Sequence, residues 1–317
     1  MKPLKDFFFP KDYADELKQL KEQSFAWKMD FSSKTEIANV GHITLFEVRD
    51  VKPFGNLVLV PGFVSNTEIE PMMCAVTYWA LKHKLNIYAI DSFFGDFQDT
   101  IDADMAAKNT VPEFVDLMDA GLEIVAKMSV GQWTCVVGHS LGGMGTMEVF
   151  NRHIAQNKPV DFSAAIMFAP FVDKDWCNFS QQFVKQRQWP DLSYDDFYNK
   201  PIGLVSPHDI YACEKVRYIS VYPRVYDDLY NLKPRPDLIA QYNIPITLVA
   251  GGKDKKSPPE YLRNVCKSTQ EYSDKNKVTF VEFPNSRHSF IGQHNDWDAV
   301  LRLIQSQRIR VRTKKVK

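Results

Sequence analysis

Residues 133–143 read Trp-Thr-Cys-Val-Val-Gly-His-Ser-Leu-Gly-Gly. The first five form a short apolar run with β-branched side chains, which is typical of a buried strand. The stretch then enters Gly138-His-Ser140-Leu-Gly142, the Gly-x-Ser-x-Gly pattern in which a strand turns into a helix around one serine. Such a turn crowds the chain on both sides of the serine, and the two glycines remove side chains that would clash there. Residues 143–150 continue as a helix, whose first N–H groups favour negative charge near the serine.

The pentapeptide by itself is a weak signal, because ordinary Gly/Ser turns produce the same pattern. The strand-compatible run before it and the helix-compatible run after it supply the context that the motif requires. We therefore interpret Ser140 as a serine displayed at a sharp turn between a strand and a helix.

Composition is that of an ordinary globular protein. Of the 317 residues, 44% are hydrophobic and 25% are charged, enough to bury a sizeable core. Lys plus Arg and Asp plus Glu number 39 each, so the chain lacks the overall basic charge of nucleic-acid-binding proteins. We predict no nucleic-acid partner.

Targeting signals are not evident in the sequence. The first ten residues lack the roughly 7–15-residue apolar core of a secretory signal, and no apolar run approaches the roughly 18 residues of a membrane span. The five cysteines are odd in number and include no Cys-x-x-Cys pair, so neither a disulfide framework nor a zinc site is indicated. We expect a cytoplasmic protein in a reducing compartment.

Residues 302–317 contain seven basic side chains and no acidic one. A basic tail can attract an anionic membrane, but a solvated, frayed terminus is the commoner interpretation. We treat residues 311–317 as a basic tail and do not expect membrane contact from it.

Strand-like and helix-like patterns alternate along the chain. Short apolar runs predict strands at 42–49, 56–60, 85–91, 133–137, 164–169, 246–250 and 278–283. Longer amphipathic patterns predict helices at 11–23, 69–84, 113–128 and 297–307, with a loop over 92–110. This alternation predicts the α/β class: a doubly wound, mostly parallel sheet covered by helices on both faces.

Residues 171–242 interrupt the alternation. They are rich in aromatic residues and prolines, and they are too numerous for a plain loop between two strands. We expect them to form a helical cap over the active edge of the sheet, although a lateral decoration that never touches substrate is the alternative. The domains are then residues 1–170 and 243–310 for the core, 171–242 for the cap insertion and 311–317 for the tail.

A serine hydroxyl becomes a nucleophile when a base removes its proton and a third group orients that base. Ligands of parallel α/β sheets bind at the carboxyl ends of the strands. Residues just after predicted strands should therefore share one edge of the sheet. They are Phe63, Asp91, Ser140, Asp254 and His288.

Histidine is the natural base near neutral pH, and the chain has seven. His288 directly follows the last predicted strand, so we expect it to be the base in preference to His294, which comes later. Asp254 also follows a strand and is the expected acid. Asp173 is a second candidate, which we interpret as a turn residue at the entry to the cap.

The chain order Ser140, Asp254, His288 matches the Ser…Asp/Glu…His order of α/β-hydrolases. Over roughly residues 40–305 the sequence resembles α/β-hydrolase-fold serine hydrolases of the capped esterase, lipase and lysophospholipase type. Four stretches carry the resemblance: Gly138-His-Ser-Leu-Gly-Gly143, Val60-Pro-Gly-Phe63, Gly251-Gly-Lys-Asp254 and Ser286-Arg-His-Ser-Phe290.

The resemblance implies an oxyanion hole made by the N–H groups of Leu141 and Phe63, with no metal and no organic cofactor. The sequence departs from the family in two places. Pro61-Gly62 replaces the usual His-Gly, and Asp91-Ser-Phe-Phe-Gly-Asp96 replaces the common acidic–Arg–Gly–x–Gly loop. We interpret Asp91 as a loop anchor rather than a proton carrier, and the subfamily stays open.

The resemblance implies a serine hydrolase that cleaves small carboxylic esters, of acyl or lipid-like type, through an acyl-enzyme. An acyl-thioesterase or acyltransferase would use the same three residues, as would peptidase and haloperoxidase variants. A non-catalytic binding protein on the same scaffold is a further alternative. The complete Ser–Asp–His set with its glycines favours an enzyme.

Overall fold

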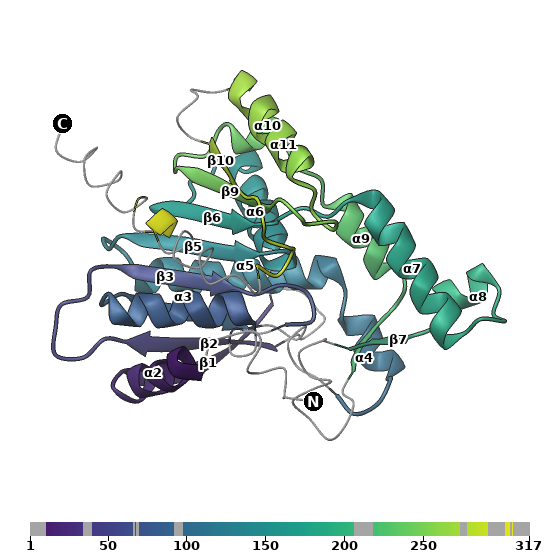
Figure 1. Ribbon diagram of the computed structural model, residues 1–317, viewed down its shortest axis with the longest axis horizontal. Coiled ribbons are helices and arrows are strands. Elements are labelled where there is room, and N and C mark those ends of the chain that lie inside the picture. Colours follow the sequence, from purple (N-terminus) through teal and green to yellow (C-terminus); the bar gives the residue numbers. More distant parts are fainter. Residues whose placement is uncertain are drawn as a thin grey trace.

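An eight-stranded sheet runs through the middle of the computed structural model (Figure 1). The structure describes residues 11–33, 40–65, 67, 70–91, 98–205, 218–272, 278–290, 302–304 and 306. In spatial order the strands are β1 (Phe25–Ser32), β2 (Val40–Glu47), β4 (Asn86–Asp91), β3 (Asn56–Val60), β5 (Thr134–His139), β6 (Ala164–Phe168), β9 (Ile246–Gly251) and β10 (Val278–Phe283). β2 pairs antiparallel with β1 and with β4, and the other neighbours are parallel.

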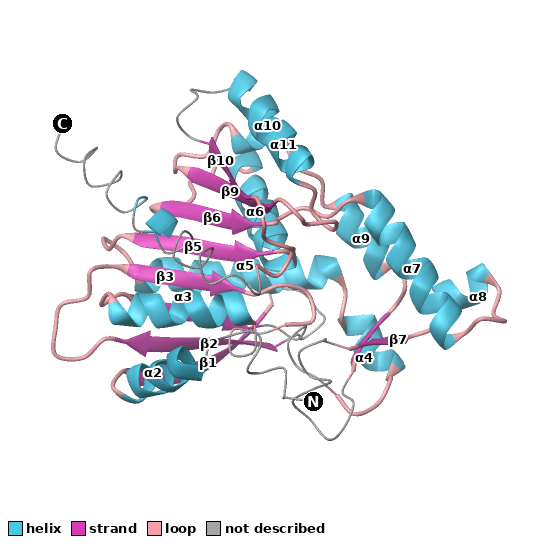
Figure 2. Cartoon of the chain, in the orientation of Figure 1, coloured by secondary structure: helices cyan, strands magenta, loops and turns pink. Residues whose placement is uncertain are grey.

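Helices cover both faces of this sheet (Figure 2). The principal ones are α2 (Lys11–Glu22), α3 (Pro71–Lys82), α5 (Val111–Met128), α6 (Leu141–Ala155) and α11 (Pro259–Tyr272). Alternate residues of β3 show how the two faces are built. Leu57 and Leu59 pack in a core with α3, whereas Val58 and Val60 pack in the opposite core with α5 and α6. The doubly wound α/β sheet predicted from the sequence is thereby confirmed.

Strand β1 was not predicted from the sequence. Apolar side chains alternate along it, but Phe25 is 50% exposed and Phe31 is the one buried member of its row. β1 pairs with β2 alone, so it is an edge strand whose formation depends on that pairing more than on burial.

The segment expected to be a loop at 92–110 contains helix α4 (Ala103–Lys108), while residues 92–97 lie outside the described part. The Asp102 carboxylate caps α4 by accepting hydrogen bonds from the N–H groups of Asp104 and Met105. Such a short helix depends on its cap and its packing rather than on a periodic pattern. Of the helix expected at 297–307, residues 302–304 and 306 are described, and they are helical.

In residues 171–205 and 218–242, the chain forms helices and one small sheet. The helices are α7 (Lys174–Gln188), α8 (Tyr194–Tyr198), α9 (Val225–Asn231) and α10 (Pro236–Ile239). β7 (Ile202–Leu204) pairs antiparallel with β8 (Ile219–Val221), which an all-helical expectation did not include. Figure 1 shows α7, α8 and α9 on the side toward which the arrows of β5, β6 and β9 point.

An earlier segment joins this small sheet. Gln98 forms a bridge with Tyr218, and the Asn109 side-chain amide donates to the Ser220 carbonyl over 2.9 Å. Pairings between residues so distant in sequence leave no local signal, so the sequence did not indicate them. In the described part of the chain, no helix is both long and apolar enough to cross a bilayer.

Candidate active site

Ser140 stands alone between a strand and a helix. β5 ends at His139 and α6 begins at Leu141, so one residue makes the whole turn. Its φ of 50° and ψ of −121° lie in a region that residues with side chains rarely adopt, at a cost of about 1–3 kcal/mol. The Ser140 N–H donates to the Phe168 carbonyl of β6 over 2.8 Å. The serine is therefore held in a strained conformation at the carboxyl edge of the sheet.

Two glycines allow the close packing around this serine. A Cβ atom on Gly142 would lie 2.2 Å from the Pro61 carbonyl oxygen and 2.3 Å from the Val60 carbonyl oxygen. A Cβ atom on Gly138 would lie 2.6 Å from the Gly143 Cα. These neighbours are backbone atoms, which cannot rotate away, so glycine alone fits at either position. The contact at Gly142 also packs the end of β3 onto the start of α6.

The structure brings Ser140, His288 and Asp254 together from three separate loops. His288 Nε2 lies 2.9 Å from Ser140 Oγ, and His288 Nδ1 lies 2.8 Å from Asp254 Oδ2. The Asp254 side chain is fully buried, and that of His288 is 14% exposed. Because a carboxylate only accepts hydrogen bonds, Nδ1 carries the proton and the Nε2 lone pair faces the serine.

The charge of Asp254 is set by burial and by its hydrogen bonds. Its other oxygen, Oδ1, accepts from the Lys256 and Ser257 N–H groups over 2.8 and 3.1 Å. Burial alone would raise the pKa of Asp254, but the attraction of His288 and these backbone donors hold it below its ordinary value. Asp254 is therefore an ionised carboxylate at neutral pH.

His288 is a neutral imidazole at neutral pH. Burial lowers the pKa of His288 to about 4, against the raising effect of Asp254, and positive charge on Lys256 and His139 lowers it further. A base must be unprotonated to accept a proton. The low pKa keeps His288 in this unprotonated form over a wide range of pH.

This low pKa predicts activity that persists in acid. In the reaction proposed below, His288 must be neutral to act as the base. The value of kcat/KM should therefore be level from pH 8 downward and decline with an apparent pKa of about 4. The measurement is a pH–rate profile on an ester whose leaving group does not titrate in this range. An acidic limb at about 6.5, the value of an ordinary histidine, would contradict the prediction.

Of the two residues expected to bind an oxyanion, Leu141 directly follows Ser140, and Phe63 directly follows Gly62, which packs against Ser140. Leu141 is the first residue of α6 and is fully buried. Phe63 follows Gly62, where a Cβ atom would lie 3.3 Å from the Ser140 Cβ. The loop after β3 therefore touches the serine. An N–H at the start of a helix points along the helix axis toward such a site.

The sequence profile of the alpha/beta hydrolase family matches residues 57–303. The chain belongs to the alpha/beta hydrolase family. A search among curated proteins finds no match.

Solved structures similar to this alpha/beta hydrolase include three proteins with low sequence identity. Est1E from Butyrivibrio proteoclasticus is 16% identical, with a TM-score of 0.55 over 88% of this chain and 98% of that one. An esterase from Pyrococcus furiosus is 13% identical, with a TM-score of 0.57 over 96% and 94%. A putative hydrolase from Agrobacterium vitis is 12% identical, with a TM-score of 0.57 over 90% and 98%. At such identities the likeness shows the fold alone.

Two other acids of this alpha/beta hydrolase have structural roles. Asp91 Oδ1 and Oδ2 accept from the N–H and the hydroxyl of Thr67, both over 2.7 Å, so Asp91 anchors the loop after β3. Asp173 is the N-cap of α7, where its carboxylate accepts from the Asp175 N–H over 2.8 Å. His294, the second histidine considered as a base, lies outside the described residues.

Two further charged residues near Ser140 were not selected from the sequence. Glu70 stands at the N-cap position of α3, and its Oε1 pairs with Nδ1 of His139, the residue before Ser140. Both are buried, 2% and 5% exposed. Nothing local marks Glu70, because it lies in a stretch that fits the start of an ordinary helix.

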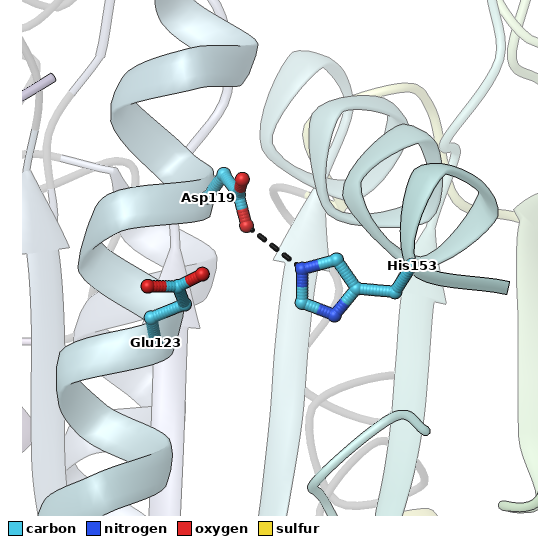
Figure 3. Close-up of side chains that lie close together, drawn as sticks. All are labelled: Asp119, Glu123 and His153. Atoms are coloured by element: carbon cyan, nitrogen blue, oxygen red, sulfur yellow. Dashed lines mark hydrogen bonds and ion pairs between the residues drawn. The ribbon is translucent and has the colours of Figure 1, made fainter. Parts of the chain in front are cut away.

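Within the described residues, one group has the composition of a metal site (Figure 3). Asp119 and Glu123 of α5 and His153 of α6 each bring one ligand atom within 4.8 Å of the others, and all three are partly buried. Asp119 Oδ1 and His153 Nε2 already bond each other over 2.9 Å. His153 lies about 20 Å along α6 from Ser140, at about 1.5 Å per residue, so this group is separate from the serine site.

Proposed function

We propose that this member of the alpha/beta hydrolase family is a serine hydrolase that cleaves small carboxylic esters of acyl or lipid-like type. One observation carries the proposal: His288 is within 2.9 Å of Ser140 Oγ and, through its other nitrogen, within 2.8 Å of the buried Asp254 carboxylate. This is the geometry that turns a serine hydroxyl into a nucleophile.

The first half of the reaction forms the acyl-enzyme. Ser140 Oγ attacks the carbonyl carbon of the ester while its proton passes to His288 Nε2, and the carbonyl oxygen becomes an oxyanion. The N–H groups of Leu141 and Phe63 bind that oxyanion, and each such donor contributes about 3–4 kcal/mol to the transition state. The C–O bond to the alcohol then breaks as His288 returns the proton to the departing oxygen.

The second half of the reaction releases the acid. Water takes the place of the alcohol, loses a proton to His288 Nε2 and attacks the acyl carbon. The bond to Ser140 Oγ then breaks and the serine recovers its proton. Asp254 holds the Nδ1 tautomer of His288 and stabilises the imidazolium that forms in each half.

Residues 171–242 form, in this proposal, a cap that shapes the acyl pocket above Ser140. The segment is tied to the loop of Asp254, since the Asp173 N–H donates to the Lys256 carbonyl over 2.7 Å. Lys256 Nζ lies 4.9 Å over the ring of Trp176 on α7, and Trp176 packs edge-on against Tyr226 of α9. In this proposal the aromatic side chains of the cap line the site of the acyl chain, because ligand sites are mostly apolar with few polar groups.

The experiment is to treat the protein with a fluorophosphonate probe and to assay a series of 4-nitrophenyl esters from C2 to C16. We expect covalent labelling and turnover, with an optimum chain length that reports the size of the pocket. Matched acyl thioesters in the same assay separate an esterase from a thioesterase, because the nucleophile is shared and only the leaving group differs. A folded protein that neither labels nor turns over any ester would overturn the proposal in favour of a binding protein.

A further inference from the structure

A buried ion pair between Glu70 and His139 adjoins Ser140. His139 is the last residue of β5, and Glu70 precedes α3 on one face of the sheet. Carboxylates are rarely buried so fully unless they are paired, and a buried pair by itself is weak evidence of stability. The contacts made by the remaining polar atoms of this pair indicate what it does.

Both nitrogens of His139 face hydrogen-bond acceptors. Nδ1 meets the Glu70 carboxylate, and Nε2 lies 2.8 Å from the backbone carbonyl of His288. The Nε2 proton is therefore donated to that carbonyl. Burial would lower the pKa of His139, but the charge of Glu70 raises it above its ordinary value. Burial would likewise raise the pKa of Glu70, which the charge of His139 holds below its ordinary value.

The second oxygen of Glu70 anchors the loop after β3. Oε2 accepts from the Gly62 N–H over 2.8 Å, immediately before Phe63. Val64, the residue after Phe63, has a φ of 57°, a left-handed conformation that strains a β-branched side chain. A strained loop keeps its shape only where neighbouring groups hold it, and Glu70 is one such group.

The loop of His288 also contains a strained residue and is also held by a hydrogen bond from this ion pair. Phe290, two residues further on, has a φ of 52°, and its N–H closes a turn onto the Arg287 carbonyl over 3.0 Å. The carbonyl of His288 in this turn is the one that accepts from His139 Nε2. One pair of side chains thus connects two strained loops that meet at the serine.

We propose that Glu70 and His139 are positioning residues that align the loop of Phe63 and the loop of His288 with Ser140. The proposal rests on the proposed serine-hydrolase function. Neither side chain touches substrate. Glu70 acts through Gly62 on the oxyanion donor of Phe63, and His139 acts through the backbone of His288 on the base. A displacement of about 1 Å at reacting groups lowers rates by about 10²-fold, so small movements of these loops have large effects.

The test compares Glu70→Ala with Glu70→Gln. Glu70→Ala removes the acceptor of the Gly62 N–H and the partner of His139, so kcat and the rate of fluorophosphonate inactivation should both fall about 10²-fold with KM within about 3-fold of wild type. Glu70→Gln keeps an oxygen for Gly62 and an amide donor for neutral His139. It should recover kcat to within about 10-fold of wild type.

Thr269→Ala is the matched control for lost stability. Thr269 is fully buried in α11, ten residues along the helix from Pro259, and its hydroxyl donates to the Val265 carbonyl over 2.8 Å. This variant should lower Tm and leave kcat and the inactivation rate unchanged. A folded Glu70→Ala protein with the kcat and inactivation rate of wild type would overturn the proposal, as would equal losses of kcat in Thr269→Ala and Glu70→Ala.

His139→Gln supplies a second measurement if Glu70→Ala does not fold. Its amide can still donate toward His288 but no longer pairs with Glu70, so kcat should fall about 10-fold at unchanged KM, and a wild-type kcat would refute the positioning role. Failure of the wild-type protein to react with the fluorophosphonate would instead count against the serine-hydrolase proposal. The two failures are therefore distinguishable.

Discussion

Replacing Ser140 with alanine is expected to abolish fluorophosphonate labelling and to lower ester turnover by about 10⁴-fold or more. The substitution removes the atom that attacks the carbonyl, so no acyl-enzyme forms. In the proposed mechanism, the residual reaction is attack by water, assisted only by substrate binding and by the N–H groups of Phe63 and Leu141. The measurements are covalent labelling, kcat/KM on the preferred ester and the thermal unfolding midpoint.

The fold should survive this change, because alanine can occupy the backbone conformation of residue 140 about as well as serine. Ser129→Ala is a matched control: Ser129 is also buried, and its hydroxyl donates to the Val125 carbonyl over 2.8 Å at the end of α5. It should label and turn over as wild type does. Turnover by Ser140→Ala above about 1% of wild type would show that another group is the nucleophile.

His288→Gln should lower kcat/KM nearly as much as Ser140→Ala does. The kcat/KM of the double variant should be no lower than that of either single variant. The reason is that the serine and its base act as one unit. Once either residue is replaced, replacing the other causes no further loss of kcat/KM. Additive losses would indicate two independent contributions and would contradict the arrangement proposed for Ser140 and His288.

The second large effect is expected at Gly142. Alanine there would place Cβ 2.2 Å from the Pro61 carbonyl oxygen and 2.3 Å from that of Val60, so the end of β3 and the start of α6 must separate. We expect the free energy of unfolding to fall by about 3 kcal/mol or more. Any folded fraction should also be nearly inactive, since the loop of Phe63 moves with β3. Denaturant titration and kcat/KM are the measurements.

Gly143→Ala is the neighbouring control for Gly142→Ala. Its Cβ would meet Pro170 Cβ at 3.1 Å and the Gly138 carbonyl at 3.2 Å, which requires shifts of a few tenths of an ångström rather than strand separation. Alanine also has the better helix propensity, by about 1 kcal/mol. The loss of stability should therefore be much smaller than at Gly142. Equal losses at the two positions would mean that the contact with β3 is not what requires glycine at 142.

Much of this protein follows from local patterns in its sequence. Buried parallel strands are short apolar runs because both of their faces are covered, and this signal is readable without any tertiary information. The glycines around Ser140 mark a turn that other residues cannot make. The order of Ser140, Asp254 and His288, each after a strand, was sufficient to predict that they would share one edge of the sheet.

Other features were decided by the tertiary structure. β1 and the β7–β8 pair depend on partners more than on their own periodicity, and α4 is too short to show one. Glu70 reads as an ordinary residue before a helix until the fold places it against His139. The physical reason is the same in each case. The periodicity of a strand or a helix is determined by residues that are neighbours in the sequence. A buried ion pair or the pairing of an edge strand joins residues that are far apart in the chain. Which of these residues meet is decided only when the whole sheet packs.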